Sequence, residues 1–525
     1  MTALAHALLT GRATMSHRLT TLGLSSLLLA AACGPGKTEP PITCGDGTRL
    51  DGTRCVSALV PIHCAPGTRL EADACVSTVA PVTCARGTHL EAGACVLDAQ
   101  ACAEGTHLAD GRCVIDPPPV HHTSWGANVR VCPEGVRCFE PQVAVGADGS
   151  LYVAYTVLLG GASQDSAVAL AVSSDDGATF TERKRFTGAE GYAYSPTLVV
   201  TAGGRVLLAW NDYQPGAGQD DYGTGDILLS TSADSGQTWS SPTTLSGPTA
   251  TALHYRPWLS VDALGVDVVW QRYESQVSSV LFVRTTDQGA TYTLPALLPD
   301  DAGPYDYVDL RGPTARLDTG ELLAPYQRVG YDLMNGGYLS QVGVQSFQQD
   351  AQGTVTSMGG VDLKRLYYTR AMPVDPHPSL AAHGSGRRCL AFVDAPSRDS
   401  DVFVLTAEAA FSSSQRPHAL PGGTGTTQLA PLAQLDATGR CHVTWLDNRA
   451  GEWALWSALV GADGLPAEPE RVSDVAFPED GVSRRLSDIT GLAVTATSRY
   501  AVWTDTRDGA QSVYLSRGPV GGYQP

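Results

Sequence analysis

The sequence predicts an all-β fold assembled from repeated units of roughly 58 residues, and three observations lead to this prediction. From about His121 onward the 525-residue chain alternates apolar and polar positions, and it holds 56 glycines and 33 prolines, as expected for short strands joined by turns. One turn motif occurs three times. An apolar strand that begins after a proline recurs at steps of about 53 to 65 residues. Long amphipathic helices are therefore not expected.

The beginning of the chain predicts export. Arg18 is followed by LTTLGLSSLLLAAA, which ends in small residues before Cys33 and is shorter than the roughly 20 apolar residues of a membrane span. The stretch resembles a bacterial lipoprotein signal, in which a peptidase cuts before a cysteine that then carries acyl chains. The resemblance implies a signal peptide over residues 1–32, a lipidated Cys33 and, because Gly34 is not Asp, the outer membrane of the cell envelope. An ordinary secretory signal is the alternative.

Four short cysteine repeats follow a tether at residues 33–43 and fill residues 44–114. TCGDGTRLDGTRCV, HCAPGTRLEADACV, TCARGTHLEAGACV and ACAEGTHLADGRCV each hold two cysteines eleven positions apart. Units this short cannot bury a core, so we expect local disulfides that pair Cys44 with Cys55, Cys64 with Cys75, Cys84 with Cys95, and Cys102 with Cys113. Zinc is disfavoured because no CxxC spacing occurs. A Pro-rich linker at residues 115–122 ends this region.

Three turn segments identify the type of the large domain. SSDDGATF, SADSGQTW and TTDQGATY share the pattern S/T-x-D-x-G-x-T-aromatic and follow strand-like runs. In such a hairpin the Asp accepts backbone N–H bonds, the Gly takes a positive φ and the aromatic side chain packs between sheets. The motif residues are Asp175, Gly177, Asp234, Gly236, Asp287 and Gly289. The pattern resembles the Asp-box of sialidases and other BNR-repeat proteins, and it implies a β-propeller whose boxes lie on outer hairpins.

The repeat predicts how many blades the propeller has. The recurring strands are Pro141-QVAV, Pro196-TLVV, Pro257-WLSV, Pro313-TARL, Pro378-SLAA, Pro431-LAQL and Gly491-LAVT. They predict seven blades over residues 123–525, with the six usual in sialidases as the alternative. The last unit is short and residues 123–131 have no unit of their own, so we expect this N-terminal strand to complete the last blade. Cys132 and Cys138 should form a disulfide beside it. Cys389 and Cys441 could form an inter-blade disulfide or stay buried thiols.

A candidate ligand site lies where the inner strands begin. The residues before these strands are Glu140, Ser195, Arg256, Arg311, His377, Ala430 and Asp488. In a propeller such positions surround one mouth of the central channel, and two arginines, a histidine and two carboxylates could bind an anionic or hydroxyl-rich ligand there. The alternative is a rim of solvated or mutually paired side chains. We therefore take Glu140, Arg256, Arg311, His377 and Asp488 as the candidate ligand-binding residues.

The sialidase resemblance implies three arginines on a substrate carboxylate, a Tyr nucleophile paired with Glu, and an Asp acid/base. Tyr255-Arg256-Pro257 is the nearest match to the first arginine motif of that family, but it has Pro directly after Arg. Arg311 or Arg328 could supply a second arginine. Tyr273 and Glu274 are adjacent, so they point to opposite faces of a strand. No catalytic residue is assigned, and whether the protein is an enzyme stays open.

The leading hypothesis is a membrane-anchored lipoprotein whose sialidase-like propeller binds a glycan or a protein ligand. A glycoside hydrolase of exo-α-sialidase type is the alternative. The formal charge of −18 opposes binding to nucleic acid. No cofactor or metal site is predicted, although acidic loops around Asp220 and Asp300 could hold Ca²⁺. The Trp-x-Asp elements at Trp210, Trp445 and Trp503 are interpreted as packing with a turn-capping Asp.

Overall fold

The computed structural model describes residues 43–521 except for 47, 58–62, 67, 73, 78–87, 92–93, 98–105, 110–111, 116–122, 161–164, 190, 216–222, 248–250, 276, 299–306, 310–311, 333–336, 351–352, 369–376, 385, 395–399, 423–425, 450 and 479–489. The chain divides into two compact units, one within residues 9–120 and one from His121 to Pro525. All regular elements of the described residues are β-strands. None of the described segments forms a helix of the length and apolarity needed to cross a bilayer.

The N-terminal unit consists of small antiparallel hairpins. Their strands are β1 (Thr48–Asp51) with β2 (Arg54–Ser57), β3 (Thr68–Glu71) with β4 (Ala74–Ser77), β5 (Thr88–Glu91) with β6 (Ala94–Leu97), and β7 (Thr106–Ala109) with β8 (Arg112–Ile115). Disulfides Cys44–Cys55 and Cys64–Cys75 close the first two, as predicted. Every residue of β1 is exposed, so the disulfide is the main source of order in that hairpin.

The other two predicted hairpin disulfides are not confirmed. Cys95 lies on β6 and Cys113 lies on β8, but the structure describes only the backbone of these two strands. Their predicted partners, Cys84 and Cys102, lie outside the described residues. The bonds from Cys84 to Cys95 and from Cys102 to Cys113 therefore stay predictions, which rest on the spacing shared with the first two repeats.

The larger unit is a succession of antiparallel sheets, which we number from sheet 1 to sheet 7 in chain order. Sheet 1 comprises β10 (Arg137–Val145), β11 (Leu151–Leu158), β12 (Ser166–Ser173) and β13 (Thr181–Thr187). Sheet 2 comprises β14 (Ala193–Val200), β15 (Val206–Gln214), β16 (Thr224–Ser232) and β17 (Thr243–Thr244). Sheet 3 comprises β18 (Leu253–Val261), β19 (Val266–Glu274), β20 (Val277–Thr285) and β21 (Ala296–Leu297). A single parallel bridge, Gly225 to Leu253, joins sheets 2 and 3.

The remaining sheets repeat this order. Sheet 4 comprises β22 (Tyr307–Asp309), β23 (Ala315–Arg316), β24 (Leu322–Asp332), β25 (Gly337–Gln349) and β26 (Val355–Tyr368). Sheet 5 comprises β27 (Ser379–Ala382), β28 (Arg388–Asp394), β29 (Asp401–Ala407) and β30 (His418–Ala419). Sheet 6 comprises β31 (Gln428–Leu435), β32 (Cys441–Asp447), β33 (Ala454–Val460) and β34 (Glu470–Arg471). Sheet 7 comprises β35 (Gly491–Val494), β36 (Ser498–Asp505), β37 (Ser512–Pro519) and β9 (Val129–Arg130).

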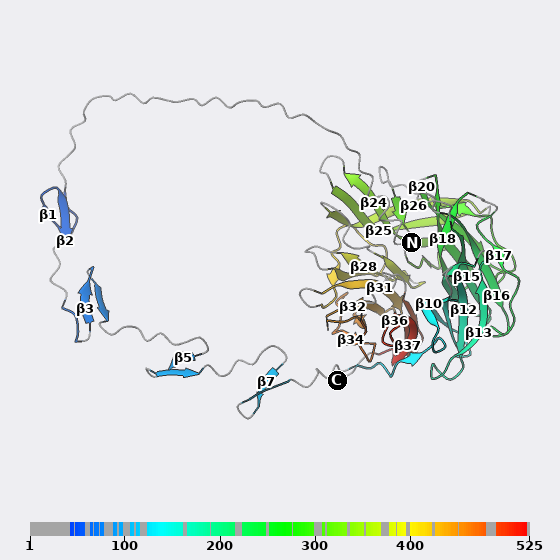
Figure 1. The fold of residues 1–525 in the computed structure, drawn as a ribbon. Coiled ribbons are helices and arrows are strands. Elements are labelled where there is room, and N and C mark those ends of the chain that lie inside the picture. Colours follow the sequence, from blue (N-terminus) through cyan, green and yellow to red (C-terminus); the bar gives the residue numbers. More distant parts are fainter. Residues whose placement is uncertain are drawn as a thin grey trace, which may run out of the picture. The chain divides into compact units, whose positions relative to one another are not determined.

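The sheets follow one another around a ring (Figure 1). Each inner strand contacts the inner strand of the next sheet, in the order β10, β14, β18, β23, β27, β31 and β35. Strand β35 in turn contacts β10, and the red β36 and β37 lie beside the cyan β10 in Figure 1. A ring of antiparallel sheets whose inner strands are neighbours is a β-propeller, so the predicted all-β propeller fold is confirmed at this level.

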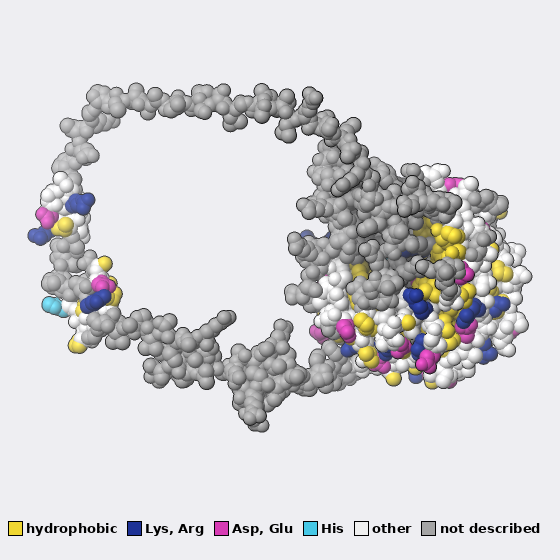
Figure 2. Space-filling model, in the orientation of Figure 1, with side chains coloured by type: hydrophobic (Ala, Val, Ile, Leu, Met, Phe, Trp, Pro, Cys, Tyr) yellow, Lys and Arg dark blue, Asp and Glu magenta, His cyan; other side chains and the backbone are white. Residues whose placement is uncertain are grey.

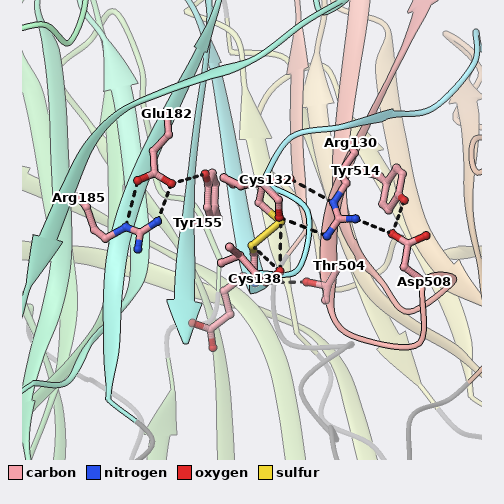
Figure 3. Close-up of a disulfide and its surroundings, with 12 residues drawn as sticks. Arg130, Cys132, Cys138, Tyr155, Glu182, Arg185, Thr504, Asp508 and Tyr514 are labelled. Carbon is pink, nitrogen blue, oxygen red and sulfur yellow. Dashed lines mark hydrogen bonds and ion pairs between the residues drawn. A yellow bond between two sulfur atoms is a disulfide. The ribbon is translucent and has the colours of Figure 1, made fainter. Parts of the chain in front are cut away.

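The N-terminal strand closes the ring, as the sequence predicts. Strand β9 pairs with β37 through Arg130 opposite Tyr514. The disulfide Cys132–Cys138 then closes the short connection between β9 and β10, which holds the strand of sheet 7 next to the start of sheet 1 (Figure 3). Pairing β9 with β37 removes an open edge from the last sheet, an edge at which another chain could otherwise add a strand.

Apolar side chains from neighbouring sheets make up the core. Trp210, Trp270, Trp445 and Trp503 are fully buried, and each of these indoles packs against the preceding sheet. A second disulfide, Cys389–Cys441, joins β28 to β32 and decides between the two alternatives for this pair in favour of an inter-sheet bridge. Disulfides persist in oxidising compartments, so their presence in both units indicates an exported protein.

The Asp-boxes have the predicted turn geometry. In the second box Asp234 accepts hydrogen bonds from Thr238 N and Thr238 Oγ1, at 2.8 and 2.5 Å, and Gly236 has a φ of 82°. These bonds lower the pKa of Asp234 to about 2, and the other two boxes repeat the pattern. Each box follows the third strand of its sheet, at the edge opposite to the start of the inner strand. The boxes therefore stabilise hairpins and lie away from the candidate site.

Candidate functional site

We call the edge of the propeller at which the inner strands begin the mouth face. Several inner strands have a bulge at this edge. In five sheets the residue before the inner-strand proline has a left-handed backbone, with φ between 40° and 54° at Glu140, Ser195, Arg256, His377 and Ala430. The paired register shifts at four of these positions, as at a β-bulge. Left-handed backbone costs roughly 1–2 kcal/mol for a residue with a Cβ, so the bulge is held by the surrounding fold.

The predicted mouth residues have different surroundings. Glu140 is buried, and its Oε2 accepts hydrogen bonds from Ser195 N at 3.0 Å, Ser195 Oγ at 3.3 Å and Thr156 Oγ1 at 3.2 Å. The structure thus joins sheet 1 to sheet 2 through this carboxylate. Arg256 and His377 are half-buried at the corresponding bulges of sheets 3 and 5. Arg311 and Asp488 lie outside the described residues, and ligand binding by this set stays a prediction.

The second strands of sheets 2 to 7 carry a repeated aromatic-x-charged element near their ends at the mouth face. In sheet 7 this element and the arginine that follows it form a hydrogen-bonded arrangement of indole, carboxylate and guanidinium, which we call the lock. Trp503 Nε1 donates to Asp505 Oδ2 at 3.0 Å, and Arg507 binds the same carboxylate at 2.6 Å while it stacks on Tyr514. Arg507 also reaches Asp474 from the preceding sheet at 2.5 Å.

Sheet 6 has an equivalent lock. Asp447 accepts hydrogen bonds from Trp445 Nε1 and Arg449, and Arg449 also donates to the carbonyl of Pro421 from sheet 5. The same carboxylate caps the following turn by accepting Arg449 N at 2.7 Å. The interpretation of the Trp-x-Asp elements as packing with turn capping therefore agrees with the contacts in sheets 6 and 7.

Sheets 2, 3 and 4 depart from the lock at the equivalent positions. In sheet 2 the buried Trp210 Nε1 finds no acceptor among the described residues, and Asp212 instead accepts Ala189 N at 3.1 Å. In sheets 3 and 4 an arginine, Arg272 or Arg328, replaces the aspartate. The residue between the aromatic and the charged side chain is an amide in these sheets, whereas it is apolar in sheets 5 and 6. The amides are Asn211, Gln271 and Gln327. The mouth face of sheets 2 to 4 is thus built differently from that of sheets 6 and 7.

Five tyrosines gather at the same edge of sheets 2 and 3. They are Tyr192, Tyr194, Tyr213, Tyr255 and Tyr273. The Tyr213 ring lies 6.2 Å from the Tyr192 ring and 5.8 Å from the Tyr194 ring, and it also packs against a cluster that contains Tyr255 and Tyr273. Tyr192, Tyr194 and Tyr213 are half-buried, so part of each ring faces solvent. Such rings offer flat apolar surface with a polar hydroxyl, which suits the face of a sugar ring.

Charged and hydrogen-bonding groups flank the tyrosines. Arg272 lies 3.8 Å from Glu274, and both side chains are about one-third exposed. The buried His254 accepts a hydrogen bond from Trp270 Nε1 at its Nδ1, at 2.9 Å. Burial lowers the pKa of His254 to about 4, so the ring is neutral at pH 7. Because Nδ1 is an acceptor, the proton of the neutral ring lies on Nε2.

A Tyr–Glu–Arg group exists in the structure, but its tyrosine is buried in the core between sheets 7 and 1. Tyr155 donates to Glu182, and Arg185 forms two hydrogen bonds with the same carboxylate (Figure 3). Glu182 is on β13, the outermost strand of sheet 1, and Tyr155 is fully buried in the core that contains Cys132 and Cys138. Burial raises the pKa of the Tyr155 hydroxyl, which makes it a poorer nucleophile. This group stabilises sheet 1 and does not supply a Tyr nucleophile at the mouth.

The charge on the described surface is mixed. Figure 2 shows basic and acidic side chains lying among one another over the described part of one face. Among the described residues no cluster of His, Cys, Asp or Glu is arranged to hold a metal ion. Of the acidic loops considered for Ca²⁺, Asp226 accepts a hydrogen bond from Ser246 Oγ, whereas Asp220 and Asp300 lie outside the described residues.

The amides and three of the tyrosines, Tyr192, Tyr194 and Tyr213, were not predicted from the sequence, whereas Tyr255 and Tyr273 were considered only as parts of a sialidase motif. A signal was present, because an aromatic residue stands two positions before the proline in the first three inner strands, at Phe139, Tyr194 and Tyr255. Comparison of the aromatic-x-charged elements with one another would also have separated sheets 2 to 4 from sheets 5 to 7. That comparison needs the strand register, which the structure supplies.

Comparison with known proteins gives only distant structural similarity. No protein-family model and no curated protein matches the sequence. The α-L-arabinanase of Penicillium chrysogenum, complexed with arabinobiose, is 14% identical with a TM-score of 0.42, over 76% of this chain and 99% of its own. The GH93 α-L-arabinofuranosidase of Fusarium graminearum is 13% identical with a TM-score of 0.45, over 76% and 99%. A leech intramolecular trans-sialidase is 12% identical with a TM-score of 0.37, over 72% and 68%. At these values the similarity concerns the overall fold alone.

Proposed function

We propose that this chain is an exported lipoprotein, anchored through Cys33 in the outer membrane, whose seven-bladed propeller binds a saccharide at the mouth face of sheets 2 to 4. The four cysteine repeats would act as a stalk between the anchor and the propeller. Incorporation of a radiolabelled fatty acid into the full chain, and its loss in Cys33→Ser, tests the anchor.

The binding proposal rests on the strand ends of sheets 2 to 4, which do not form the lock. In sheets 6 and 7 the arginine that binds the aspartate of the lock also contacts the preceding sheet, where Arg449 donates to the Pro421 carbonyl at 2.7 Å and Arg507 pairs with Asp474 at 2.5 Å. The corresponding groups of sheets 2 to 4 are combined with half-buried tyrosines and with amides. Aromatic faces beside a few charged and amide groups are the usual composition of sites for small polar ligands.

Two tyrosine substitutions test the proposal. We expect wild-type protein to bind members of a panel of neutral and sialylated oligosaccharides. Tyr194→Ala and Tyr213→Ala should each weaken that binding roughly tenfold or more, because each ring offers a stacking face. Tyr292→Ala is the matched control, since Tyr292 is a half-buried tyrosine in the third Asp-box, at the opposite edge. Absence of binding to the whole panel by folded wild-type protein would reject the proposal.

The alternative, an exo-α-sialidase, draws support from Arg256, Arg272 and Arg328, which lie at the mouth face of sheets 3 and 4. Arg272 and Arg328 each have a carboxylate partner, Glu274 at 3.8 Å and Asp362 at 3.4 Å, which disfavours a free carboxylate clamp. A fluorogenic sialoside distinguishes the two functions. Turnover that disappears in Arg256→Ala would establish the hydrolase, and no turnover by protein that binds saccharides would leave binding as the function.

A further inference from the structure

Gln341 is a buried amide whose hydrogen-bonding groups are unused. The side chain is 1% exposed, and neither Nε2 nor Oε1 has a partner among the described residues. Gln428 shows what a structural glutamine of this protein looks like. It is also fully buried, but its Oε1 accepts Val402 N at 2.7 Å and its Nε2 donates to Asp447 at 3.0 Å. Buried polar groups are almost always bonded, so an amide with two unused atoms requires an explanation.

The neighbours of Gln341 form a polar group on one face of sheet 4. Arg328 lies opposite Gln341 in the register of β24 and β25, and Tyr326 lies opposite Gly343. Tyr326 donates to Asp362, and Arg328 stacks on the Tyr326 ring at 3.9 Å. A Cβ on Gly343 would clash with the Tyr326 hydroxyl, so glycine at this position lets the tyrosine cross the sheet to reach Asp362.

This polar group faces sheet 3. Farther from the mouth, Leu322 and Ala324 pack with Val269 of β19 in one apolar core. Since side chains alternate along a strand, the positions that continue this face toward the mouth are Tyr326 and Arg328 on β24, and Gln271 and Tyr273 on β19. The space between sheets 3 and 4 therefore changes from apolar to polar toward the mouth face, beside the tyrosine cluster.

We propose that Gln341, with Tyr326, Arg328 and Asp362, is a subsite that binds a neutral, hydroxyl-bearing sugar ring, and this inference rests on the proposed saccharide-binding function. The unused amide offers both a donor and an acceptor, which matches a pair of hydroxyls. A carboxylate would use only the donor and would leave Oε1 without a partner. The charge of Arg328 is offset by Asp362 at 3.4 Å, so the group does not select for an anion. Contact with the amide requires a neighbouring side chain to move, as is common on binding.

Two glutamine substitutions in the full chain test the subsite. Gln341→Leu removes an unused amide, so it should leave the thermal midpoint unchanged or higher, and it should weaken binding of neutral oligosaccharides by at least roughly tenfold. Gln428→Leu removes a fully bonded amide, so it should lower the midpoint and leave binding unchanged. If the Gln341→Leu variant does not fold, Gln341→Met replaces it, because methionine is unbranched like glutamine and lacks the amide.

The outcomes separate the subsite from the proposed function. Equal binding by wild type and both Gln341 variants would overturn the subsite while leaving saccharide binding in place. If wild-type protein binds only the sialylated members of the panel, the assignment of the subsite to neutral sugars is wrong. Failure of folded wild-type protein to bind any saccharide would reject the proposed function, and the subsite with it.

Discussion

His254 shows how a single residue acquires its properties from burial. Its ring is 1% exposed and is held by the indole N–H of Trp270. Desolvation penalises the charged form more strongly than the nearby Asp226 and Glu274 favour it, so the pKa falls from 6.5 to about 4. The neutral ring therefore keeps one tautomer over the pH range in which an ordinary histidine would become charged.

We expect His254 to make the stability of the protein depend on pH. Between pH 6.5 and pH 4 the unfolded chain binds a proton at this position and the folded chain does not, so the free energy of unfolding falls as the pH is lowered through this window. Urea unfolding at several pH values should show a shallower slope for His254→Gln than for wild type. An NMR titration of the ring with a midpoint near 6.5 would contradict the assignment.

The strand ends show how one element serves two purposes. In sheets 6 and 7 the buried aspartate accepts hydrogen bonds from the indole and the arginine of its own sheet. The same arginine also contacts the preceding sheet, at Pro421 or Asp474. In sheets 3 and 4 the same place in the strand holds an arginine, and the ion pairs of these arginines with Glu274 and Asp362 are longer, at 3.8 and 3.4 Å. A repeat fold can replace a structural lock in some copies while the others keep the ring together.

Paired substitutions should separate the two purposes. Asp447→Ala leaves Arg449 and the buried Trp445 N–H without their shared acceptor, so we expect it to lower the free energy of unfolding by about 3–5 kcal/mol. Arg272→Ala removes a partly exposed pair with Glu274 and should cost no more than about 1 kcal/mol. Chemical denaturation measures both values. Similar costs for the two variants would mean that the arginine is also a structural lock.

The whole molecule is stabilised by the segment that closes the ring. Trp125 is 6% exposed, donates its indole N–H to Ser457 Oγ at 2.7 Å and lies under the guanidinium of Arg499. Ser124 and Arg499 both bind Glu470 of sheet 6. The segment before β9 thus connects sheets 6 and 7, while the disulfide that follows β9 connects sheets 7 and 1.

Trp125→Ala should therefore weaken the ring as a whole. We expect a loss of about 3–5 kcal/mol in the free energy of unfolding, the usual cost of removing a buried tryptophan. Loss of β9 would also expose the edge of β37, so aggregation should begin at lower temperature than in wild type. Thr123→Ala is the control, because it keeps the indole and removes only a hydroxyl, which donates to Arg471 O and accepts from Trp125 N, so it should cost about 2 kcal/mol or less. Light scattering during a thermal scan follows both effects.

The sequence by itself determined the elements whose chemistry is local. The Asp-box turns, the hairpin disulfides Cys44–Cys55 and Cys64–Cys75, and the closing strand at residues 129–130 follow from spacing, turn residues and period, which neighbouring residues specify without help from the rest of the chain. The same repeat located the residues before the inner-strand prolines, although the left-handed backbone that five of them adopt was not foreseen.

Only the tertiary structure decided which repeats carry the candidate site. Glu140 meets Ser195 across 55 positions of sequence, and Tyr255 joins the tyrosine cluster from a different sheet than Tyr194. Whether a buried amide is bonded, as in Gln428, or unused, as in Gln341, depends on which side chains the neighbouring strands bring within reach. These pairings arise between strands that are distant in the chain, and a local pattern of residue types does not encode the register that brings them together.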